Sequence, residues 1–155
     1  MSSVTLDLLD RLVGNWTTEA THPAMPGVTV HGEAKIEWLE GRKFLIIRAA
    51  TDHPQFPDSI SIVGFTDADR ASEIAVAGAL SMHYYDSRGV YRDQACSIDE
   101  GAWRWWRNSP GWSQRFTGTF ADGGATIIGQ SELCEDDVEW KADLAITYRR
   151  ATDRS

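Results

Sequence analysis

The 155-residue sequence lacks several features that would place a protein in a membrane or outside the cell. It has no run of 18 consecutive apolar residues, so we expect no transmembrane helix. Its first residues lack the uncharged apolar stretch of a signal peptide, which predicts a cytoplasmic protein. The two cysteines, Cys96 and Cys134, show no CxxC spacing. We therefore expect two reduced thiols, and neither a structural disulfide nor a zinc site.

Motifs for metal, cofactor or nucleophilic chemistry are also missing from the sequence. No two histidines are spaced as in HxxxH or HExxH, so no metal centre is expected. There is no P-loop, dinucleotide-binding fingerprint or nucleophile elbow, which argues against kinase, Rossmann and hydrolase classes. We predict that the protein uses neither a metal nor a cofactor. The four histidines are His22, His31, His53 and His83.

The composition is that of one acidic globular domain spanning residues 1–155. Hydrophobic residues make up 42% and charged residues 25%, close to the average of folded proteins. The formal net charge of -8 is scattered along the chain. Such a charge argues against a nucleic acid or an anionic membrane as partner. Seven tryptophans predict aromatic-rich walls inside the fold.

A helical pattern occurs at the start of the chain, over residues 5–13. Apolar residues recur there at helical spacing, with Thr5 as a possible N-cap and Gly14 as the stop. This predicts one short helix with an apolar stripe. The stripe consists of Leu6, Leu9, Leu12 and Val13.

From residue 15 onward, short runs of alternating polar and apolar residues are divided by turn residues, as in an all-β meander. Residues 67–72 are predicted to form a loop, and Gly78 interrupts the strand that follows as a bulge or bend. The clearest alternation lies at 28–39, where Val30, Ala34 and Ile36 share one face. The ten expected strands cover 15–22, 28–39, 43–52, 59–66, 73–86, 90–98, 102–107, 112–120, 125–133 and 138–149.

Ten strands joined mostly by short hairpins favour a closed sheet, because closure removes the exposed strand edges. We therefore predict an all-β fold, a single antiparallel up-and-down β-barrel over residues 15–149. A sandwich with Greek-key crossings is the alternative, since strand number alone does not fix the winding. A barrel of this size leaves either a pocket or a core crowded with aromatic side chains.

The opening of the first strand, Gly14-Asn15-Trp16 after a short helix, resembles the GxW-type start of lipocalins and the openings of fatty-acid-binding and nitrobindin-like barrels. A longer pattern, covering nearly the whole chain, resembles a family of uncharacterised bacterial lipocalin-like proteins of the calycin superfamily. The resemblance implies a barrel and no particular activity. The pattern comprises His22, Pro23, Pro26, Gly27, Trp38 to Gly41, Phe44, Leu45, Asp52 to Pro54, 83–90 and 113–118.

Two departures limit what the resemblance implies about a ligand. Fatty-acid-binding proteins carry a helix-turn-helix lid between their first two strands, where this chain has only a short Pro/Gly connection. Nitrobindin-like barrels bind haem through a histidine near the C-terminal end, and the stretch from Trp140 to Arg149 contains no histidine. Neither a fatty-acid portal nor a haem ligand is carried over.

The candidate ligand-binding residues come from four predicted strands. In the strand 112–120, Gln114 and Phe116 share an apolar face that is expected to point inward, and a buried glutamine needs a partner. Either face of the strand 43–52 could be inside, and an inward Arg48 would anchor a carboxylate or phenolate. The stretch 83–88 brings titratable groups together, although His83 also fits an ordinary sheet position. The predicted set is Arg48, His83, Tyr84, Asp86, Trp105, Gln114 and Phe116.

Three functions fit these observations. The first is binding of a small hydrophobic or amphipathic molecule in the barrel interior. The second is a cofactor-independent enzyme of the cyclase or isomerase type acting on such a molecule, which would need an inward Asp, His or Tyr with a shifted pKa. The third is a structural or interaction module with a filled core. A homodimer is compatible with each of them.

Overall fold

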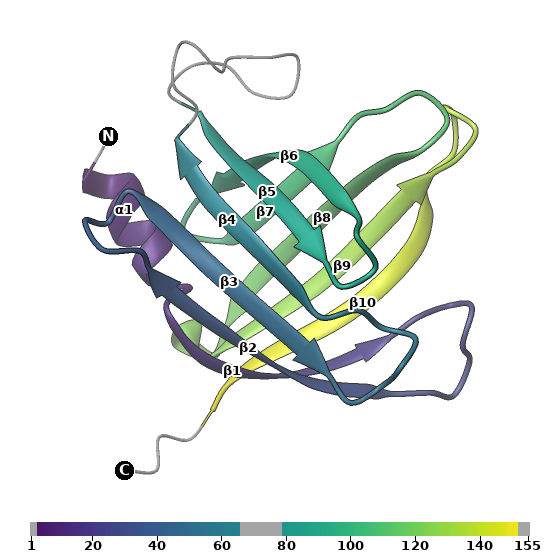
Figure 1. Cartoon of the computed structure of the whole chain (residues 1–155), viewed down its shortest axis with the longest axis horizontal. Helices are drawn as coiled ribbons and strands as arrows, with labels where there is room; N and C mark the ends of the chain where they lie inside the picture. The colour runs from purple at the N-terminus through teal and green to yellow at the C-terminus, as the bar shows by residue number, and fades with distance from the viewer. Residues whose placement is uncertain (1–2, 66–78, 152–155) are drawn as a thin grey trace.

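The computed structural model describes residues 3–65 and 79–151, and over this part of the chain ten antiparallel strands close into a barrel (Figure 1). One helix, α1, precedes the strands and lies at one end of the barrel. The elements are α1 (Ser3–Asp10), β1 (Gly14–Thr21), β2 (Val30–Trp38), β3 (Phe44–Thr51), β4 (Ser59–Phe65), β5 (Leu80–Asp86), β6 (Tyr91–Ile98), β7 (Ala102–Arg107), β8 (Ser113–Ala121), β9 (Thr126–Cys134) and β10 (Lys141–Arg150).

Each strand pairs with the strands before and after it in the sequence, and β1 pairs with β10 to close the sheet. The order around the barrel is therefore up-and-down, which rules out the sandwich with Greek-key crossings. The predicted all-β barrel with one short N-terminal helix is confirmed. Closure gives every strand two hydrogen-bonded neighbours and leaves no free edge.

The helix differs from its prediction at both ends. It begins at Ser3 and ends at Asp10, so Thr5 lies within it rather than capping it. The chain then makes tight turns in which the N–H of Leu12 donates to the carbonyl of Leu9. Gly14 opens β1 with a φ of 142°, and a Cβ there would lie 2.6 Å from a guanidinium nitrogen of Arg150. Gly14, which was predicted to end the helix, is therefore the first residue of β1, and the absence of a side chain lets Arg150 pack closely against it.

The last strand also differs from its prediction, since β10 begins at Lys141 rather than at 138. The Asp136 carboxylate accepts hydrogen bonds from the backbone N–H groups of Val138 and Glu139 and holds them in a turn. The β10 strand contains a bulge between Ala142 and Ala145. The predicted loop 67–72 and the predicted strand residues 73–78, with the bend at Gly78, lie outside the described residues.

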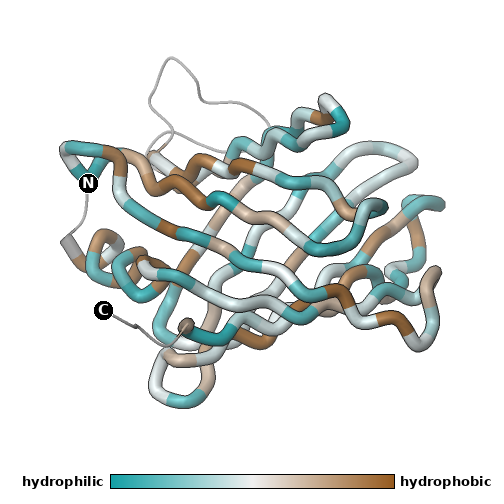
Figure 2. Tube along the Cα trace, turned by 60° about the horizontal axis from the view of Figure 1, so that its bottom comes forward, coloured by the Kyte–Doolittle hydropathy of each residue, from teal (hydrophilic) through white to brown (hydrophobic). Residues whose placement is uncertain are grey.

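Hydrophilic and hydrophobic residues follow one another along the strands (Figure 2), and this alternation divides the side chains between the interior and the outer surface. On β3, the inward residues are Leu45, Ile47 and Ala49, whereas Arg48 points outward and is exposed. This settles the face of β3, which the sequence left open. Arg48 therefore does not reach the interior. The expectation that an inward Arg48 would anchor a carboxylate or phenolate there is wrong.

The helix end of the barrel is filled and closed. Leu9 and Leu12 are buried against Trp16, whose indole Nε1 donates to the carbonyl of Leu12 over 2.8 Å. Arg150 lies over the Trp16 ring at 4.2 Å and donates to the carbonyls of Arg11, Val13 and Gly124. Its guanidinium satisfies backbone acceptors that the short helix and its neighbouring loop would leave unpaired.

Candidate functional site: a cavity at the open end of the barrel

A cavity of about 290 Å³ occupies the half of the barrel away from α1. Three of the loops that join strands at this end contribute to its rim: Phe56 follows β3, Arg88 follows β5 and Trp112 precedes β8. Further in, the walls come from inward-facing residues of β3 to β10. The cavity is therefore bounded by the core on one side and by connecting loops on the other.

Aromatic rings form the floor of the cavity. Trp105 and Phe116 are stacked, with their planes 9° apart and their centroids separated by 5.5 Å. Trp103 meets Phe116 edge-on at 5.3 Å and approaches Tyr148 at 6.3 Å. Tyr148 in turn meets Trp16, which belongs to the packed end. A continuous set of rings therefore connects the closed end with the cavity, and the interior is rich in aromatic residues, as the tryptophan content predicted.

Two glycines make room for the central ring of this floor. Gly118 and Gly129 are directly paired across β8 and β9. A Cβ built at Gly129 would lie 2.6 Å from the Phe116 ring, and one at Gly118 would lie 3.0 Å from it. Phe116 therefore lies flat over the pair, because neither position carries a side chain.

One wall carries a hydrogen-bonded group of three side chains, Tyr84, Asp86 and Arg88. The Tyr84 hydroxyl donates to the Asp86 carboxylate over 2.7 Å, and the Arg88 guanidinium donates to it over 2.6 Å. The backbone N–H groups of Arg88 and Val90 complete the shell. The side chain of Asp86 is fully covered by these contacts.

These contacts hold both acidic groups in fixed protonation states. Burial raises the pKa of Tyr84 well above its usual value, and the Asp86 carboxylate beside it adds to the rise. Burial alone would raise the pKa of Asp86, but its hydrogen bonds with Arg88 and Tyr84 lower it well below the usual range. At neutral pH the tyrosine keeps its proton and the aspartate stays ionised. The arrangement suits fixed hydrogen bonding better than proton transfer.

A second acid at the cavity is also paired. Asp143 lies within the β10 bulge and lines the cavity, and its carboxylate is 2.7 Å from Nε2 of His22. The other ring nitrogen of His22 accepts a hydrogen bond from the backbone N–H of Ala24. The bulge turns Asp143 toward the end of β1, so its carboxylate has a partner on the opposite side of the β1–β10 seam.

The β6 wall presents polar groups that have few partners. Arg92 lines the cavity with its guanidinium 4.3 Å from the centroid of the Trp112 ring. Burial lowers the pKa of Arg92, and the charges of Arg107 and Arg88 lower it further. Gln94, two residues further along the same face, is 3% exposed, and its Oε1 has no hydrogen-bond partner in the described part of the chain. A buried amide oxygen without a donor is uncommon.

One group deeper in the cavity, the indole N–H of Trp103, is almost as poorly satisfied. The indole Nε1 of Trp103 is buried beside the Cys96 sulfur, a weak acceptor, and makes no conventional hydrogen bond to a described residue. Burial raises the pKa of the Cys96 thiol to about 12, so the group is an un-ionised thiol at neutral pH. Burial likewise raises the pKa of Tyr148 to about 12. Cys96 and Cys134 are both free, as predicted.

Four of the seven predicted site residues line the cavity: Tyr84, Trp105, Gln114 and Phe116. Asp86 is hydrogen-bonded to Tyr84. Gln114 points inward with Phe116, and Arg115 points outward to Glu132 over 2.9 Å, both as the alternation of β8 predicts.

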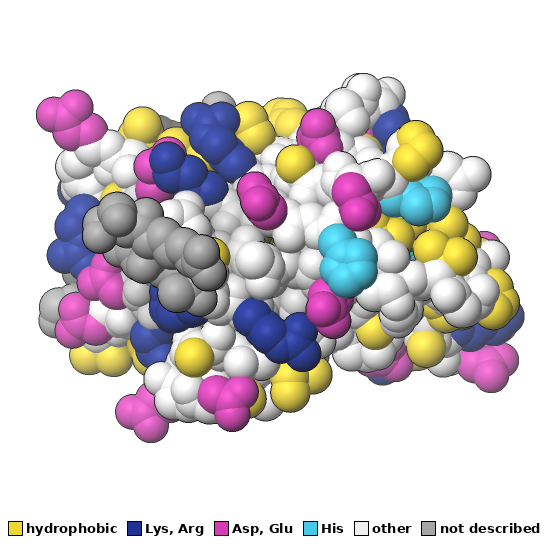
Figure 3. Space-filling model, turned by 90° about the horizontal axis from the view of Figure 1, so that it is seen from below, with side chains coloured by type: hydrophobic (Ala, Val, Ile, Leu, Met, Phe, Trp, Pro, Cys, Tyr) yellow, Lys and Arg dark blue, Asp and Glu magenta, His cyan; other side chains and the backbone are white. Residues whose placement is uncertain are grey.

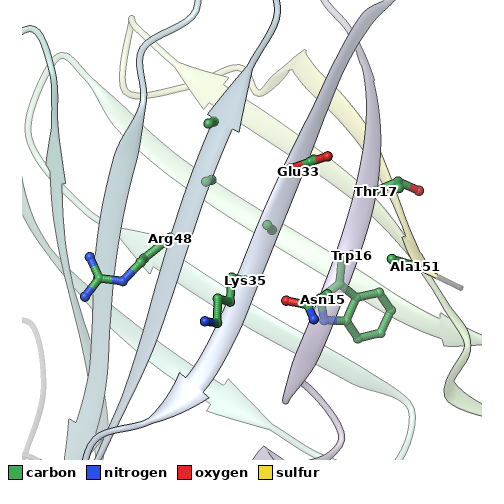
Figure 4. A pocket seen from close by; sticks show the side chains of 10 residues that line it. Asn15, Trp16, Thr17, Glu33, Lys35, Arg48 and Ala151 are labelled. Atoms are coloured by element: carbon green, nitrogen blue, oxygen red, sulfur yellow. The ribbon is translucent and has the colours of Figure 1, made fainter. Parts of the chain in front are cut away.

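The other two predicted residues lie outside the cavity. His83 is on the outer face of β5, where its Nδ1 is 2.6 Å from Asp93 of β6, so the ordinary sheet position is the correct interpretation. Arg48 lines a separate hollow of about 350 Å³ on the outer surface of β1, β2 and β3 (Figure 4). Glu33 and Lys35 of β2 line this hollow as well.

Sequence reasoning missed the two residues that leave the most unused hydrogen-bonding capacity in the cavity, Arg92 and Gln94. A signal for them was present, because both share a period-two face with Cys96 and Ile98. A charged or amide group on the apolar face of a strand is a candidate for contact with a ligand. The other missed residues, Arg88, Trp112, Asp143 and Tyr148, depend on loops, on the bulge or on packing between strands.

Among residues 3–65 and 79–151, no group of three or more His, Cys, Asp or Glu side chains is arranged to hold a metal ion. No helix in the same part of the chain is long and apolar enough to cross a membrane. A scan against protein-family models finds no match for the chain, and a search of curated protein sequences finds none either. The closed antiparallel barrel of ten strands, counted over the described residues, is consistent with calycin-like folds.

Proposed function

We propose that the protein binds one small, largely apolar molecule in the cavity at the open end of its barrel. The observation that carries the proposal is a cavity of about 290 Å³ that combines a stacked aromatic floor with a buried amide oxygen, Gln94 Oε1, to which no described residue donates. Ligand sites are typically concave and mostly apolar, with a few polar groups that orient the guest. The closed barrel supports the same function, because a barrel of this size can hold a small ligand in its interior.

The size and chemistry of the cavity favour binding over the two alternatives. A volume of about 290 Å³ is near the lower end of the typical range for ligand pockets, about 300 to 1,000 Å³. This suits a small guest and weighs against a structural module with a filled core. Tyr84 and Asp86 do have shifted pKa values, as the enzyme alternative requires. The pKa values of both are moved away from neutrality, however, and the two groups are engaged with each other and with Arg88, which weighs against proton transfer.

The test uses a matched pair of substitutions on β3. Ala49 lines the cavity, whereas Ala50 is exposed on the outer face. Ala49→Phe places a ring in the cavity, and Ala50→Phe adds the same ring outside. A panel of one- and two-ring aromatic acids, amides and alcohols would be titrated against each protein, and tryptophan fluorescence followed. Trp103, Trp105 and Trp112 lie at the cavity and report on its occupation.

We expect wild type and Ala50→Phe to bind the same members of the panel. Ala49→Phe should bind them at least about tenfold more weakly, because the ring occupies their volume. Urea unfolding of both variants checks that the barrel is intact. Equal binding by Ala49→Phe and wild type would contradict the proposal. A wild type that binds no member of the panel would contradict it as well.

A further inference from the structure

We infer that the cavity contains an anion subsite at Arg92 and therefore selects small aromatic carboxylates over their neutral analogues. This inference rests on the proposed function and specifies the chemical class of the ligand. It depends on which polar groups near the cavity are already paired and which are not.

Arg92 differs from the arginines of the outer surface in its surroundings. Acidic and basic side chains are interspersed over the face seen in Figure 3. On the outer surface Arg104 pairs with Asp99, Arg115 with Glu132 and Arg149 with Glu19. Within the described residues, by contrast, Arg92 forms no ion pair, and its guanidinium lies over the face of Trp112. A ring face engages the charge and leaves the N–H donors of the guanidinium free for an acceptor.

The carboxylate of Asp86 offsets only part of the charge of Arg92, because its hydrogen-bonding positions are taken by other groups. Asp86 is enclosed by Tyr84 and Arg88, and Asp143 is paired with His22. Arg107, a close neighbour of Arg92, donates to the carbonyl of Trp112. The charges of Arg88 and Arg107 both act unfavourably on Arg92. Three arginines, Arg88, Arg92 and Arg107, therefore gather at the mouth of an otherwise acidic protein, and an anion beside Arg92 would relieve their mutual repulsion.

Gln94 gives an independent indication of a ligand on the same wall. Its Oε1 is buried and has no partner among residues 3–65 and 79–151, and Gln94 belongs to the same inward face of β6 as Arg92. Leaving such an oxygen without a donor is unfavourable, so a guest with an N–H or O–H group would be favoured there.

The apolar part of the ligand has a complementary surface in the stack of Trp105 on Phe116. A flat ring packs well against such a surface, while its carboxylate accepts hydrogen bonds from Arg92. The expected ligand is a small aromatic acid, preferably one with an N–H or O–H donor on its ring.

Calorimetric titration with indole-3-acetate and its neutral analogue indole-3-acetamide tests this inference. The proteins are wild type, Arg92→Met, Arg92→Lys and Arg104→Met. Arg104→Met is the matched control, because Arg104 lies on the neighbouring strand and faces outward. Wild type and Arg104→Met should bind the acid about tenfold more tightly than the amide, as one charge-assisted hydrogen bond would give. Arg92→Met should bind both equally, and Arg92→Lys should keep part of the preference.

Binding of the amide by Arg92→Met at wild-type affinity shows that the variant is folded and its cavity intact. Equal affinity of wild type for acid and amide, or an undiminished preference in Arg92→Met, would overturn the anion subsite and leave the proposed function standing. Failure of wild type to bind either probe would overturn the subsite. Combined with a negative result for the whole aromatic panel, that failure would overturn the proposed function too.

Discussion

The two ends of the barrel each place an arginine over a tryptophan, and they use it differently. At the helix end, Arg150 lies 4.2 Å from the Trp16 ring centroid and its nitrogens donate to three backbone carbonyls. At the open end, Arg92 lies 4.3 Å from the Trp112 ring centroid, and no side-chain hydrogen bond joins it to another described residue. The first arginine completes the fold, whereas the second carries unused hydrogen-bonding capacity into a cavity.

The difference extends to the residues around each arginine. Leu9, Leu12 and Trp16 are almost completely buried at the helix end, and the Trp16 nitrogen is paired. At the other end, a cavity remains and Gln94 Oε1 has no partner within the described chain. Stability is concentrated where polar groups are satisfied and space is filled. A binding site needs the opposite arrangement, because its unsatisfied groups are available to the guest.

The largest effect is expected from removing the packing of the closed end. Leu12→Ala should lower the free energy of unfolding by about 2–5 kcal/mol, because it leaves a cavity against Trp16 and Leu9. Leu39→Ala, at a half-exposed position in the loop after β2, should change it by less than about 0.5 kcal/mol. Urea unfolding measures both. If the two variants lost equal stability, the closed end would not be the stabilising core.

A pair of arginine substitutions tests the comparison directly. Arg150→Met should cost about 1–3 kcal/mol of unfolding free energy, because it leaves the carbonyls of Arg11, Val13 and Gly124 without their donor. Arg92→Met should cost less than about 0.5 kcal/mol. The measurement is again urea unfolding, at neutral pH and without ligand. A loss for Arg92→Met as large as that for Arg150→Met would show that both arginines serve the fold.

The smallest effect concerns Asp86, a polar group of the open end whose hydrogen bonds are satisfied. Asp86→Asn should destabilise the protein by about 1–2 kcal/mol at pH 7, because it weakens the bonds from Tyr84 and Arg88. Hydrogen bonding holds the pKa of folded Asp86 below its ordinary value of 3.8. The ionised carboxylate therefore stabilises the wild type above that value, and this contribution is lost as the pH falls through the lower folded pKa.

The difference between wild type and Asp86→Asn should accordingly be constant from about pH 7 to pH 5 and shrink below pH 4. Urea unfolding at a series of pH values follows it. Arg104→Met, which removes an exposed ion pair with Asp99, supplies a control with little effect at any pH. A difference between wild type and Asp86→Asn that grew in acid would contradict the assignment of Asp86 as the ionised acceptor.

Local pattern was sufficient to predict the class of fold and several inward faces. The period-two alternation of β2 and β8 placed Ile36, Gln114 and Phe116 correctly, because a strand directs successive side chains to opposite faces. The turn residues predicted where the strands are separated. The strand β10 begins later than predicted, at Lys141, because the Asp136 carboxylate accepts hydrogen bonds from the backbone N–H groups of Val138 and Glu139. Such features depend on residues close together in the chain, which a sequence displays directly.

Tertiary structure decided the face of β3 and the content of the site. Phe44 and Ile46 are as apolar as Leu45 and Ile47, so only pairing with β2 and β4 determines that Arg48 lies outside. The contact of Arg92 with Trp112 joins separate elements of the chain and depends on how they meet at the mouth. The sequence by itself determined an all-β chain with aromatic walls. Closure of the barrel decided which inward side chains surround a cavity, because the space between them depends on the pairing of strands that are far apart in the sequence.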